Sequence, residues 1–426
     1  MLDVRLLRSD PETARRRLSR RRDPLALAAF DRVLELDERR RTVIAEVEVL
    51  KARRNEVSRE IGERKRAGED TQDLVESMQG VADRIRSLDA EQAEIESSLE
   101  WELLRIPNLP HELVPEGAEG EHEVVKEWGE PVHLGFDPAT HWDLGERLGI
   151  LDMERGARVA GSGFPLLMGA GARLSRALID FMLDLHVEEH DYVEVLPPFL
   201  CNRDSLTATG QLPKFEEDVY RTVPDDLFLI PTAEVPLTNL HRGEILDGRE
   251  LPIAYVAYTP CFRREAGAAG RDTRGMLRVH QFDKVELVRL TTAQSSDGEL
   301  ELLTRHAESV LERLDLPYRR IRLATGDLGF ANALTYDLEV WSAGVGKWLE
   351  VSSCSSYTDY QARRGDIRYR PDGKGKPEFV HTLNGSGVAL ARTIVALLEN
   401  NQEGDGSVRI PEVLRPYLGR ERLEIP

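Results

Sequence analysis

Residues 262–287 concentrate charged and small side chains between two apolar runs: FRREAGAAGRDTRGMLRVHQFDKVEL holds three glycines, five arginines and two glutamates. The apolar runs at 253–262 and 276–290 are predicted to pair as a β-hairpin. Small residues in the connecting loop let a polyanion approach the backbone, and arginines donate paired hydrogen bonds that match phosphate oxygens. Arg263 ends the first strand and is held by the sheet, whereas Arg271 and Arg274 lie in the loop. This pattern favours a phosphate-binding surface.

The returning strand carries groups that suit a nucleobase. Phe282 and Glu286 are four residues apart and point to the same face, because strand side chains alternate. The Phe282 ring could stack on a base, and Glu265 could accept a hydrogen bond from an exocyclic amine. The simpler alternative is a surface hairpin with salt bridges and a buried phenylalanine. The stretch matches neither the Rossmann nor the P-loop glycine pattern, so neither type of phosphate site is predicted.

Three other segments carry polar groups that could join this site. PTAEVPL, residues 231–237, places polar residues between apolar neighbours. HTLNGSGVALARTIVALLEN, residues 381–400, is predicted to be a turn that opens a helix, with Arg392 near its first turns. Glycines at that helix N-terminus could favour an anion, although plain helix capping is the alternative. Oxygen ligands on a predicted strand suit Mg²⁺ held mainly by substrate phosphates; they are Glu350, Ser352 and Ser353.

The first hundred residues carry heptad repeats. One helix, from Val33 to Ile61, has apolar residues in two heptad series, and a second helix, from Leu74 to Ile106, repeats the pattern. The polar turn GERKRAGED, residues 62–70, separates them. We therefore predict a projecting antiparallel coiled-coil hairpin. Each helix of about 33 residues would be roughly 50 Å long.

The two predicted helices differ in charge. Residues 1–66 hold 19 Lys or Arg and 13 Asp or Glu, which gives 19 − 13 = +6, and residues 69–102 hold 2 and 11, which gives −9. Opposite charges indicate that the helices attract each other. The first helix could also present cations to an anionic partner, or the charges could be ordinary solvated groups.

The remaining chain mixes helices and strands. PNLPHELVPEGAEGE, residues 107–121, is rich in proline and glycine and is predicted to be a linker. A helix at 172–190 is followed by a strand that Pro197 and Pro198 end. Two strand pairs and helices at about 299–314 and 388–400 follow. Strands joined mostly by loops indicate an α+β domain built on an antiparallel sheet flanked by helices.

Composition limits the class of protein. The 426 residues carry a formal charge of −19, which excludes a uniformly basic nucleic-acid binder but allows a local basic face. The three cysteines show no zinc-ligand or disulfide spacing, so we expect a reducing compartment and no zinc. The first ten residues lack the apolar core of a signal peptide, and no apolar run is long enough to span a bilayer. We therefore expect a soluble cytoplasmic protein.

Taken together, these segments resemble the class II aminoacyl-tRNA synthetases, most closely the bacterial-type seryl-tRNA synthetases. The stretch 262–286 resembles the second class motif, NGSGVALARTIVALLEN the third, and the helix 172–190 with its strand the first. The resemblance implies a homodimer built through the first motif, ATP with Mg²⁺, serine as substrate, and serine tRNA gripped by the N-terminal arm. Selenocysteine tRNA is implied where one is present. The implied domains are a tRNA-binding domain at 1–106, the linker at 107–121 and a catalytic domain at 122–426.

The resemblance also implies roles for individual residues. Arg263 would hold the α-phosphate and the serine carboxylate, Glu265 the adenine, and Arg392 the γ-phosphate, which makes these three the catalytic candidates. The implied ATP-binding set is Arg263, Arg264, Glu265, Val279, Phe282, Glu350, Val351, Ser352, Ser353 and Arg392. The implied serine-binding set is Thr232, Ala233, Glu234, Arg263, Glu286, Asn384 and Ser386. The implied Mg²⁺ ligands are Glu350 and Ser353.

Some features depart from the family pattern or favour other functions. Arg264 replaces a smaller residue, and Ser356 and Tyr357 replace Asn and Cys, at positions with no role in the implied catalysis. HVEEH, residues 186–190, matches a zinc-peptidase pattern in which His186 and His190 could share a metal. Two alternatives keep the family fold: an enzyme that loads carrier proteins, which the intact arm disfavours, and a non-catalytic scaffold, which the complete set of arginines and glutamates disfavours.

Overall fold

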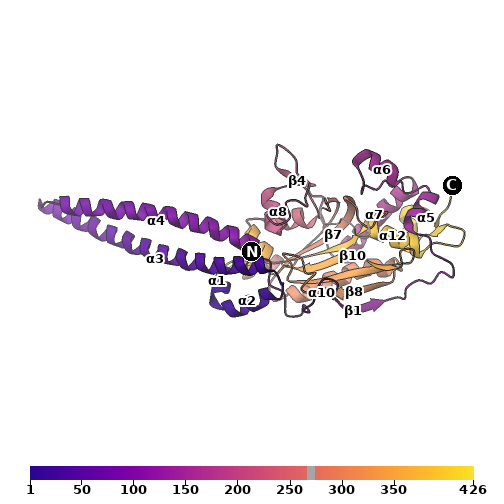
Figure 1. Cartoon of the computed structure of the whole chain (residues 1–426), viewed down its shortest axis with the longest axis horizontal. Coiled ribbons are helices and arrows are strands. Elements are labelled where there is room, and N and C mark those ends of the chain that lie inside the picture. Colours follow the sequence, from indigo (N-terminus) through magenta and orange to yellow (C-terminus); the bar gives the residue numbers. More distant parts are fainter. Residues whose placement is uncertain (266–273) are drawn as a thin grey trace. The chain divides into compact units, whose positions relative to one another are not determined.

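The computed structural model describes residues 1–265 and 274–426, so Arg271 and the rest of segment 266–273 lie outside the described residues. The chain divides into two compact units, Met1–Pro107 and Asn108–Pro426 (Figure 1). Among the described residues, every helix is too short or too polar to cross a membrane.

The first unit is built on a long two-helix arm, which confirms the predicted hairpin. Helices α3 (Pro24–Ala67) and α4 (Gln72–Arg105) run antiparallel, and the short helices α1 (Val4–Ser9) and α2 (Pro11–Ser19) pack beside the base of α3 (Figure 1). Helix α3 has 44 residues and starts earlier than the heptads indicate. The Asp23 carboxylate caps its first turn, and Pro24 suits the first helical position. At the far end Gly68 adopts φ +76°, which ends the helix in a left-handed turn.

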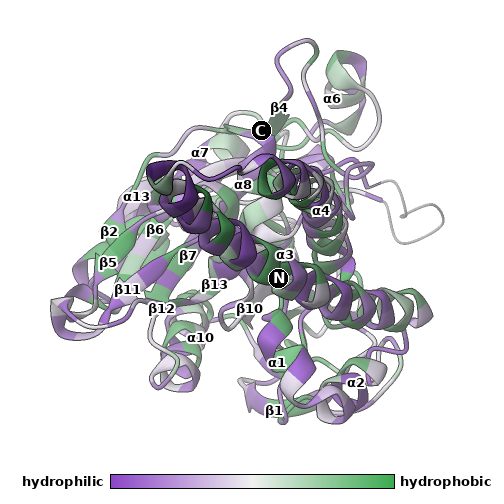
Figure 2. Ribbon diagram, turned by 90° about the vertical axis from the view of Figure 1, so that its left-hand side faces the viewer, coloured by the Kyte–Doolittle hydropathy of each residue, from purple (hydrophilic) through white to green (hydrophobic). Residues whose placement is uncertain are grey.

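The arm is held by an apolar seam and by charges across it. Heptad residues of both helices are buried, among them Val33, Val47, Leu88 and Ile95. Figure 2 shows hydrophilic residues along much of the outer surface of α3. Ion pairs join the helices: Arg39 to Glu91 at 2.7 Å, Arg84 to Glu46 at 2.8 Å and Lys51 to Asp89 at 3.4 Å. The predicted attraction between the helices is therefore confirmed, although exposed pairs of this kind contribute at most about 1 kcal/mol each.

The second unit is built on an eight-stranded sheet, as the α+β prediction requires. Every neighbouring pair in this sheet is antiparallel except β2 and β6. The strands in spatial order are β1 (Glu123–Trp128), β8 (Tyr318–Arg322), β9 (Leu334–Ser342), β10 (Lys347–Ser356), β13 (His381–Ala389), β7 (Gln281–Thr291), β6 (Ile253–Phe262) and β2 (Val193–Glu194).

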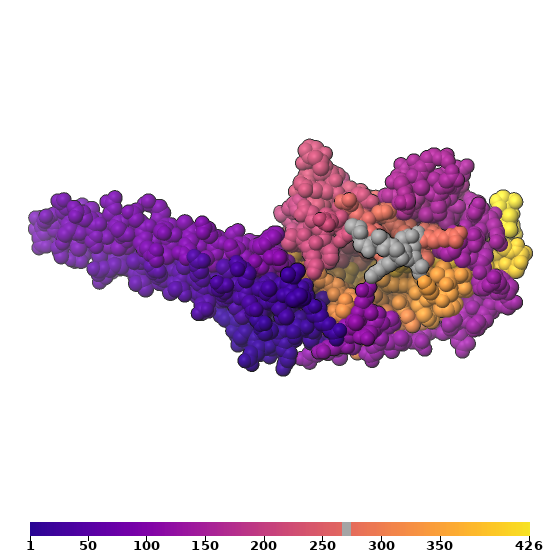
Figure 3. All heavy atoms as spheres, viewed as in Figure 1, coloured from indigo at the N-terminus to yellow at the C-terminus, as the bar shows by residue number. Residues whose placement is uncertain are grey.

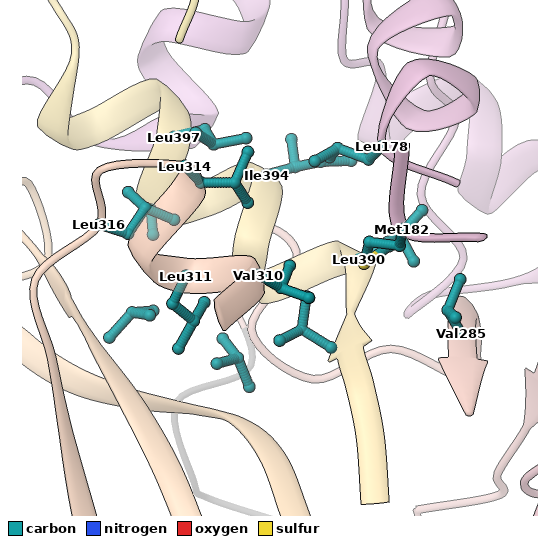
Figure 4. Close-up of a cluster of buried hydrophobic side chains, with 14 of the residues drawn as sticks. Leu178, Met182, Val285, Val310, Leu311, Leu314, Leu316, Leu390, Ile394 and Leu397 are labelled. Carbon is teal, nitrogen blue, oxygen red and sulfur yellow. The ribbon is translucent and has the colours of Figure 1, made fainter. Parts of the chain in front are cut away.

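Three helices bury the apolar side of this sheet. They are α7 (Ala170–Glu188), α10 (Ser296–Arg313) and α12 (Leu390–Asn400), and all three match predicted helices to within a few residues. Figure 4 shows Met182 of α7, Val310 of α10 and Ile394 of α12 converging in one buried cluster with Val285 of β7. The sheet is therefore covered from behind, and a smaller apolar cluster that includes Val288 and Leu290 covers part of its other face.

Smaller elements complete the unit. The remaining α-helices are α5 (His141–Arg147), α6 (Met153–Ala160), α8 (Arg203–Thr209), α9 (Glu234–Thr238), α11 (Tyr360–Gly365) and α13 (Arg415–Leu418). The remaining strands are β3 (Leu200–Asn202), β4 (Leu227–Leu229), β5 (Ile245–Asp247), β11 (Arg368–Arg370), β12 (Glu378–Phe379), β14 (Val408–Arg409) and β15 (Arg422–Leu423). Short 3-10 helices lie at η1 (Asn239–His241), η2 (Gly248–Glu250), η3 (Pro371–Gly373) and η4 (Glu412–Leu414).

Two predicted elements differ from the structure. Residues 381–389 form strand β13, so the prediction of a turn with glycines at a helix N-terminus is wrong. The glycines permit close packing: a Cβ on Gly385 would lie 2.3 Å from Leu303 Cδ2, and one on Gly387 would lie 2.9 Å from His186 Nε2. The strand predicted before Pro197 is only the two residues of β2, because it pairs with β6 alone at the sheet edge.

Candidate active site

The β6–β7 hairpin places the central residues of the site. Its antiparallel register pairs Cys261 with Phe282 and Ala257 with Glu286, which confirms the predicted hairpin and the shared face of Phe282 and Glu286. A cavity of about 320 Å³ opens on this face of the sheet. The cavity is lined by these predicted site residues: Thr232, Glu234, Arg263, Glu265, Val279, Phe282, Glu350, Val351, Ser353, Asn384, Ser386 and Arg392.

One end of the cavity holds two buried carboxylates joined by an amide. The Asn384 Nδ2 donates to Glu234 Oε2 at 3.2 Å and to Glu286 Oε1 at 2.8 Å. Lys284 forms an ion pair with Glu286 and donates to Thr232 Oγ1 at 2.8 Å. Two carboxylates thus face one lysine, which leaves a negative charge that one more cation would balance.

Glu234 is the carboxylate whose charge is least compensated. It is 6% exposed, and Gln361 Nε2 donates to it at 2.6 Å. Burial, and after it the nearby Glu286 carboxylate, raise the pKa of Glu234 to about 7. A bound ammonium group would offset both the burial of the Glu234 charge and its repulsion by Glu286, because it supplies a positive charge and hydrogen-bond donors.

The other end combines an aromatic face with guanidinium groups. The Arg263 guanidinium lies 5.1 Å from the centre of the Phe282 ring, and the Arg263 amide donates to the His280 carbonyl at 2.9 Å. Glu265 has a positive φ of 51° and accepts from Arg278 at 2.8 Å. An aromatic platform beside a carboxylate and two arginines is an arrangement that can bind a nucleotide base and its phosphates.

Arg392 of α12 reaches the same end from the opposite side of the cavity. Its Nη1 donates to the Glu350 carbonyl at 2.7 Å and lies 3.6 Å from the Glu350 carboxylate, and its Nε donates to the Leu277 carbonyl at 3.1 Å. Two backbone carbonyls therefore fix the guanidinium, which leaves its remaining donors available to an anion.

Strands β9 and β10 offer oxygen ligands to a divalent cation. Ser353 pairs with Asp337 across the two strands, and Glu350 lies on the same strand as Ser353. Asp337 is 8% exposed, and its Oδ1 is buried with no hydrogen-bond partner. Burial and then the Glu350 charge raise the pKa of Asp337 well above its usual value. A hard cation would relieve this repulsion, so the donor set fits Mg²⁺.

The structure places the other predicted residues beside the cavity rather than in its wall. The Arg264 amide donates to the Asp218 carbonyl at 3.0 Å, and the Ser352 hydroxyl donates to the Ser386 carbonyl at 2.7 Å. Ala233 is fully buried in an apolar cluster behind the cavity. Arg274 lies 4.6 Å from the Trp142 ring centre.

Several lining residues are absent from the predicted set. They are Arg278, Lys284, Asn332, Ser355 and Tyr357 in the cavity wall, with Asp337 below it. Lys284 lies midway between Phe282 and Glu286 on one strand, so the alternation of strand side chains places it on the same face and could have identified it. The sequence predicts no catalytic role for Tyr357, yet its hydroxyl donates to Asn384 Oδ1 at 2.9 Å. Asp337 carries no such signal, because only strand pairing brings it to Ser353.

The predicted alternatives for metal chemistry gain little support. His186 and His190 face each other with their Nδ1 atoms 2.9 Å apart, as the helical spacing predicts. Across residues 1–265 and 274–426, however, no three histidine, cysteine or acidic side chains are grouped to hold a metal. All three cysteines are buried free thiols.

Comparison with known proteins identifies the family. The seryl-tRNA synthetase N-terminal domain matches residues 1–110, and the class II core domain of the synthetases for G, H, P, S and T matches residues 214–401. Serine–tRNA ligase from Exiguobacterium sp. is 53% identical over 428 residues, with 100% of both chains covered. The chain belongs to the seryl-tRNA synthetase family.

Other seryl-tRNA synthetases agree along the whole chain. Serine–tRNA ligase from Clostridium tetani is 51% identical and covers 98% of this chain and 99% of its own. The crystal structure of seryl-tRNA synthetase from Pyrococcus horikoshii complexed with ATP has a TM-score of 0.95 at 40% identity, with both chains covered completely. The cytoplasmic enzyme from Naegleria fowleri in complex with AMP has a TM-score of 0.90 at 30% identity, covering 100% of this chain and 99% of its own. The predicted family, fold class and ligase activity are thereby confirmed.

Proposed function

We propose that this protein attaches serine to tRNA in two steps at the cavity on the sheet. In the first step the serine carboxylate attacks the α-phosphorus of ATP, forming seryl-adenylate and releasing pyrophosphate. In the second step a hydroxyl of the tRNA 3′-terminal ribose attacks the serine carbonyl and AMP leaves. The observation that carries this proposal is that one cavity joins a two-carboxylate pocket to an aromatic and arginine-lined end.

The two-carboxylate end is the proposed serine site. Glu234, Glu286 and Thr232 would bind the ammonium group, and Asn384 keeps the two carboxylates in place. Arg263, between the two ends, would hold the serine carboxylate. Ser386 lies in the same wall, near the side chain of the substrate. A site that bonds the serine hydroxyl rejects alanine by roughly 10⁴-fold or more, since alanine leaves buried polar groups unpaired.

The arginine end is the proposed ATP site. Adenine would stack on Phe282 and donate to Glu265, while Val279 and Val351 line its edges. Arg263 would neutralise the α-phosphate, where negative charge develops during attack, and Arg392 would bind the γ-phosphate. Catalysis in this arrangement comes from positioning and charge stabilisation, so it needs no covalent nucleophile from the protein.

Mg²⁺ belongs to this ATP site. Glu350 and Ser353 would hold the ion. The buried carboxylate of Asp337, which pairs with Ser353 across the strands, would add a second negative charge near it. The ion supplies charge neutralisation on the phosphates when it is bound. Arg392, which lies 3.6 Å from the Glu350 carboxylate, would bridge the metal ligand and the leaving pyrophosphate.

Residues 1–106 are the proposed tRNA-binding domain, 107–121 the linker and 122–426 the catalytic domain. Double-stranded RNA is recognised mainly through its shape and backbone, which suits a rigid cationic arm. On the distal half of α3 the exposed cations Arg54, Arg59, Lys65 and Arg66 face solvent. Serine tRNA is the proposed ligand, together with selenocysteine tRNA where one is present, and the proposed location is the cytoplasm.

A homodimer is proposed through the end of α7 and the segment after it. This region exposes apolar side chains, and a dimer interface could bury them: Val193 is 60% exposed and Leu196 is 81% exposed. Val187, Phe199 and Leu200, close by in the sequence, are also exposed. The two-residue strand β2 also leaves a sheet edge available for a second copy. Sedimentation should show a dimer, and Leu196→Glu should shift it toward monomer.

The deciding experiment is attachment of labelled serine, alanine or threonine to total tRNA with ATP and Mg²⁺. Charging with serine alone is expected. A variant lacking residues 32–104 should lose tRNA charging but still form the adenylate. If the full protein forms adenylate without charging tRNA, a carrier protein is the acceptor; if neither reaction occurs in the folded protein, the scaffold alternative holds.

A further inference from the structure

His141 and Glu399 form a buried pair next to the wall of the reaction cavity. Both side chains are fully buried, and His141 Nδ1 lies 2.8 Å from Glu399 Oε1. We propose that these two are positioning residues for the ATP end of the cavity. The pair holds the main chain at residues 276–277 and, through it, the Arg392 guanidinium. The inference rests on the proposed function, because it names the groups that support that nucleotide site.

Glu399 is surrounded by hydrogen-bond donors. Its Oε1 also accepts from the His141 amide at 2.8 Å. Its Oε2 accepts from the Ser342 hydroxyl and from the amides of Gly344, at 2.9 Å, and Val345, at 3.0 Å. Burial alone would raise the pKa of Glu399, but the hydrogen bonds from His141 and Ser342 outweigh it and hold this pKa below its usual value. The group is therefore a carboxylate, which only accepts hydrogen bonds.

The two partners of the His141 ring fix its tautomer. Since the Glu399 carboxylate has no proton to give, the proton of that hydrogen bond lies on His141 Nδ1. The Met276 amide donates to His141 Nε2 at 3.1 Å, so Nε2 carries a lone pair. The ring is thus a neutral imidazole that connects Glu399 to the main chain at Met276. The chain packs tightly on the ring, because a Cβ on Gly275 would lie 2.2 Å from His141 Nε2.

The main chain held by this bond belongs to the wall of the reaction cavity. Met276 and Leu277 both line the cavity. The Leu277 carbonyl accepts from Arg392 Nε at 3.1 Å, so it is one of the acceptors that fix the guanidinium. Helix α12 carries both Arg392 and Glu399, about two turns apart. A shift of Met276 would therefore move the acceptor of Arg392 relative to the helix that carries the arginine.

A second contact joins the same segment to helix α5. The Arg274 guanidinium lies 4.6 Å from the centre of the Trp142 ring, which meets the His141 ring edge to face with ring centres 4.8 Å apart. In Figure 3 the coral segment that leads into β7 lies against the magenta region that contains α5. Arg274 is exposed, whereas the bond from Met276 to His141 is buried and directional. The buried bond is therefore the contact that sets the position of the main chain.

Two amide substitutions separate the two hydrogen bonds of the His141 ring. In His141→Gln the side-chain oxygen reaches the position of Nε2 and can still accept from Met276. In His141→Asn the side-chain nitrogen takes the position of Nδ1 and keeps the bond to Glu399, but the buried Met276 amide loses its acceptor. His141→Asn should raise KM for ATP in pyrophosphate exchange about tenfold or more, as expected for a buried donor left unpaired. His141→Gln should recover most of this loss.

The two substrates provide the internal control. KM for serine should stay near the wild-type value in both variants, because Asn384 and Lys284 hold the serine end. His133→Asn, at an exposed histidine, controls for the loss of an imidazole elsewhere. Melting temperatures show whether each variant is folded. An unchanged KM for ATP in His141→Asn, equal rises in the Asn and Gln variants, or equal rises for both substrates would overturn the proposal.

Nitrogen-15 NMR of the histidine rings tests the pair without measuring activity. The His141 signal, assigned by its loss in His141→Gln, should show a neutral ring with its proton on Nδ1. A proton on Nε2 would leave Met276 without an acceptor and would also overturn the proposal. If the wild-type protein shows no serine-dependent pyrophosphate exchange, the proposed function fails instead, whichever tautomer is found.

Discussion

Glu234 and Glu286 are bridged by one amide: Asn384 donates to both carboxylates, at 3.2 Å and 2.8 Å. The residues come from helix α9, strand β7 and strand β13, so the bridge exists only in the folded protein. Lys284 compensates one of the two negative charges. The other charge has no such partner lysine among the described residues, and this relationship sets the behaviour expected of the proposed serine site.

Serine binding should therefore depend on pH near neutrality. The Glu234 pKa is about 7, so this carboxyl is largely protonated at pH 6 and largely ionised at pH 8. A neutral carboxyl attracts an ammonium group weakly, so KM for serine should fall about tenfold as pH rises from 6 to 8. Steady-state pyrophosphate exchange across this range measures the effect. A flat profile would show that Glu234 does not titrate on binding.

Glu234→Gln should remove both the charge and the pH dependence. We expect KM for serine to rise by about 10- to 150-fold, which is the cost of losing a hydrogen bond to a charged group. KM for ATP should change little, since the proposed nucleotide site is at the other end of the cavity. Glu244→Gln, at an exposed carboxylate, serves as the control. An equal rise in both KM values would place Glu234 outside the serine site.

Asp337→Asn should weaken metal binding and stabilise the metal-free protein. The Mg²⁺ concentration for half-maximal serine activation should rise by about 10- to 100-fold, as for other residues that support metal ligands. Since folding raises the pKa of Asp337, its ionised form destabilises the fold above that carboxyl's unfolded pKa, and stability falls as pH rises. The variant should therefore melt at a higher temperature at pH 7 without Mg²⁺.

The control for this variant is Asp359→Asn, which removes a carboxylate paired with Arg363 at 2.7 Å. It should leave the Mg²⁺ requirement unchanged. An unaltered Mg²⁺ requirement in Asp337→Asn would remove Asp337 from the metal site, even if the melting temperature rises.

The arm cations should control tRNA affinity but not serine activation. Arg54→Gln with Arg59→Gln removes two exposed charges from α3, so binding of serine tRNA should weaken. The slope of log affinity against log salt should decrease by about 1 for each phosphate that the arm no longer neutralises. Filter binding at several salt concentrations measures both quantities. Arg86→Gln on the acidic helix α4 is the matched control. Unchanged affinity and slope would place the RNA on another surface.

Much of this molecule was predictable from local patterns. Heptads determine the two-helix arm, because each apolar seam must be buried against the other. Alternation places Phe282 and Glu286 on one face of a strand. The concentration of arginine, glycine and glutamate at 262–287 identifies the hairpin around which the site is built. These features depend on the spacing of neighbouring residues, which the sequence displays directly.

Other features were decided only by tertiary structure. Residues 381–389 are a strand because β7 and β10 pair with them on both sides, and their glycines make room for Leu303 and His186. Asp337 reaches Ser353 through strand pairing, and Tyr357 reaches Asn384 across the cavity. The sequence by itself determined the arm, the hairpin and the kind of chemistry. The fold decided which distant side chains share one buried environment, because charge compensation and the Glu234 pKa depend on distances in space rather than on spacing along the chain.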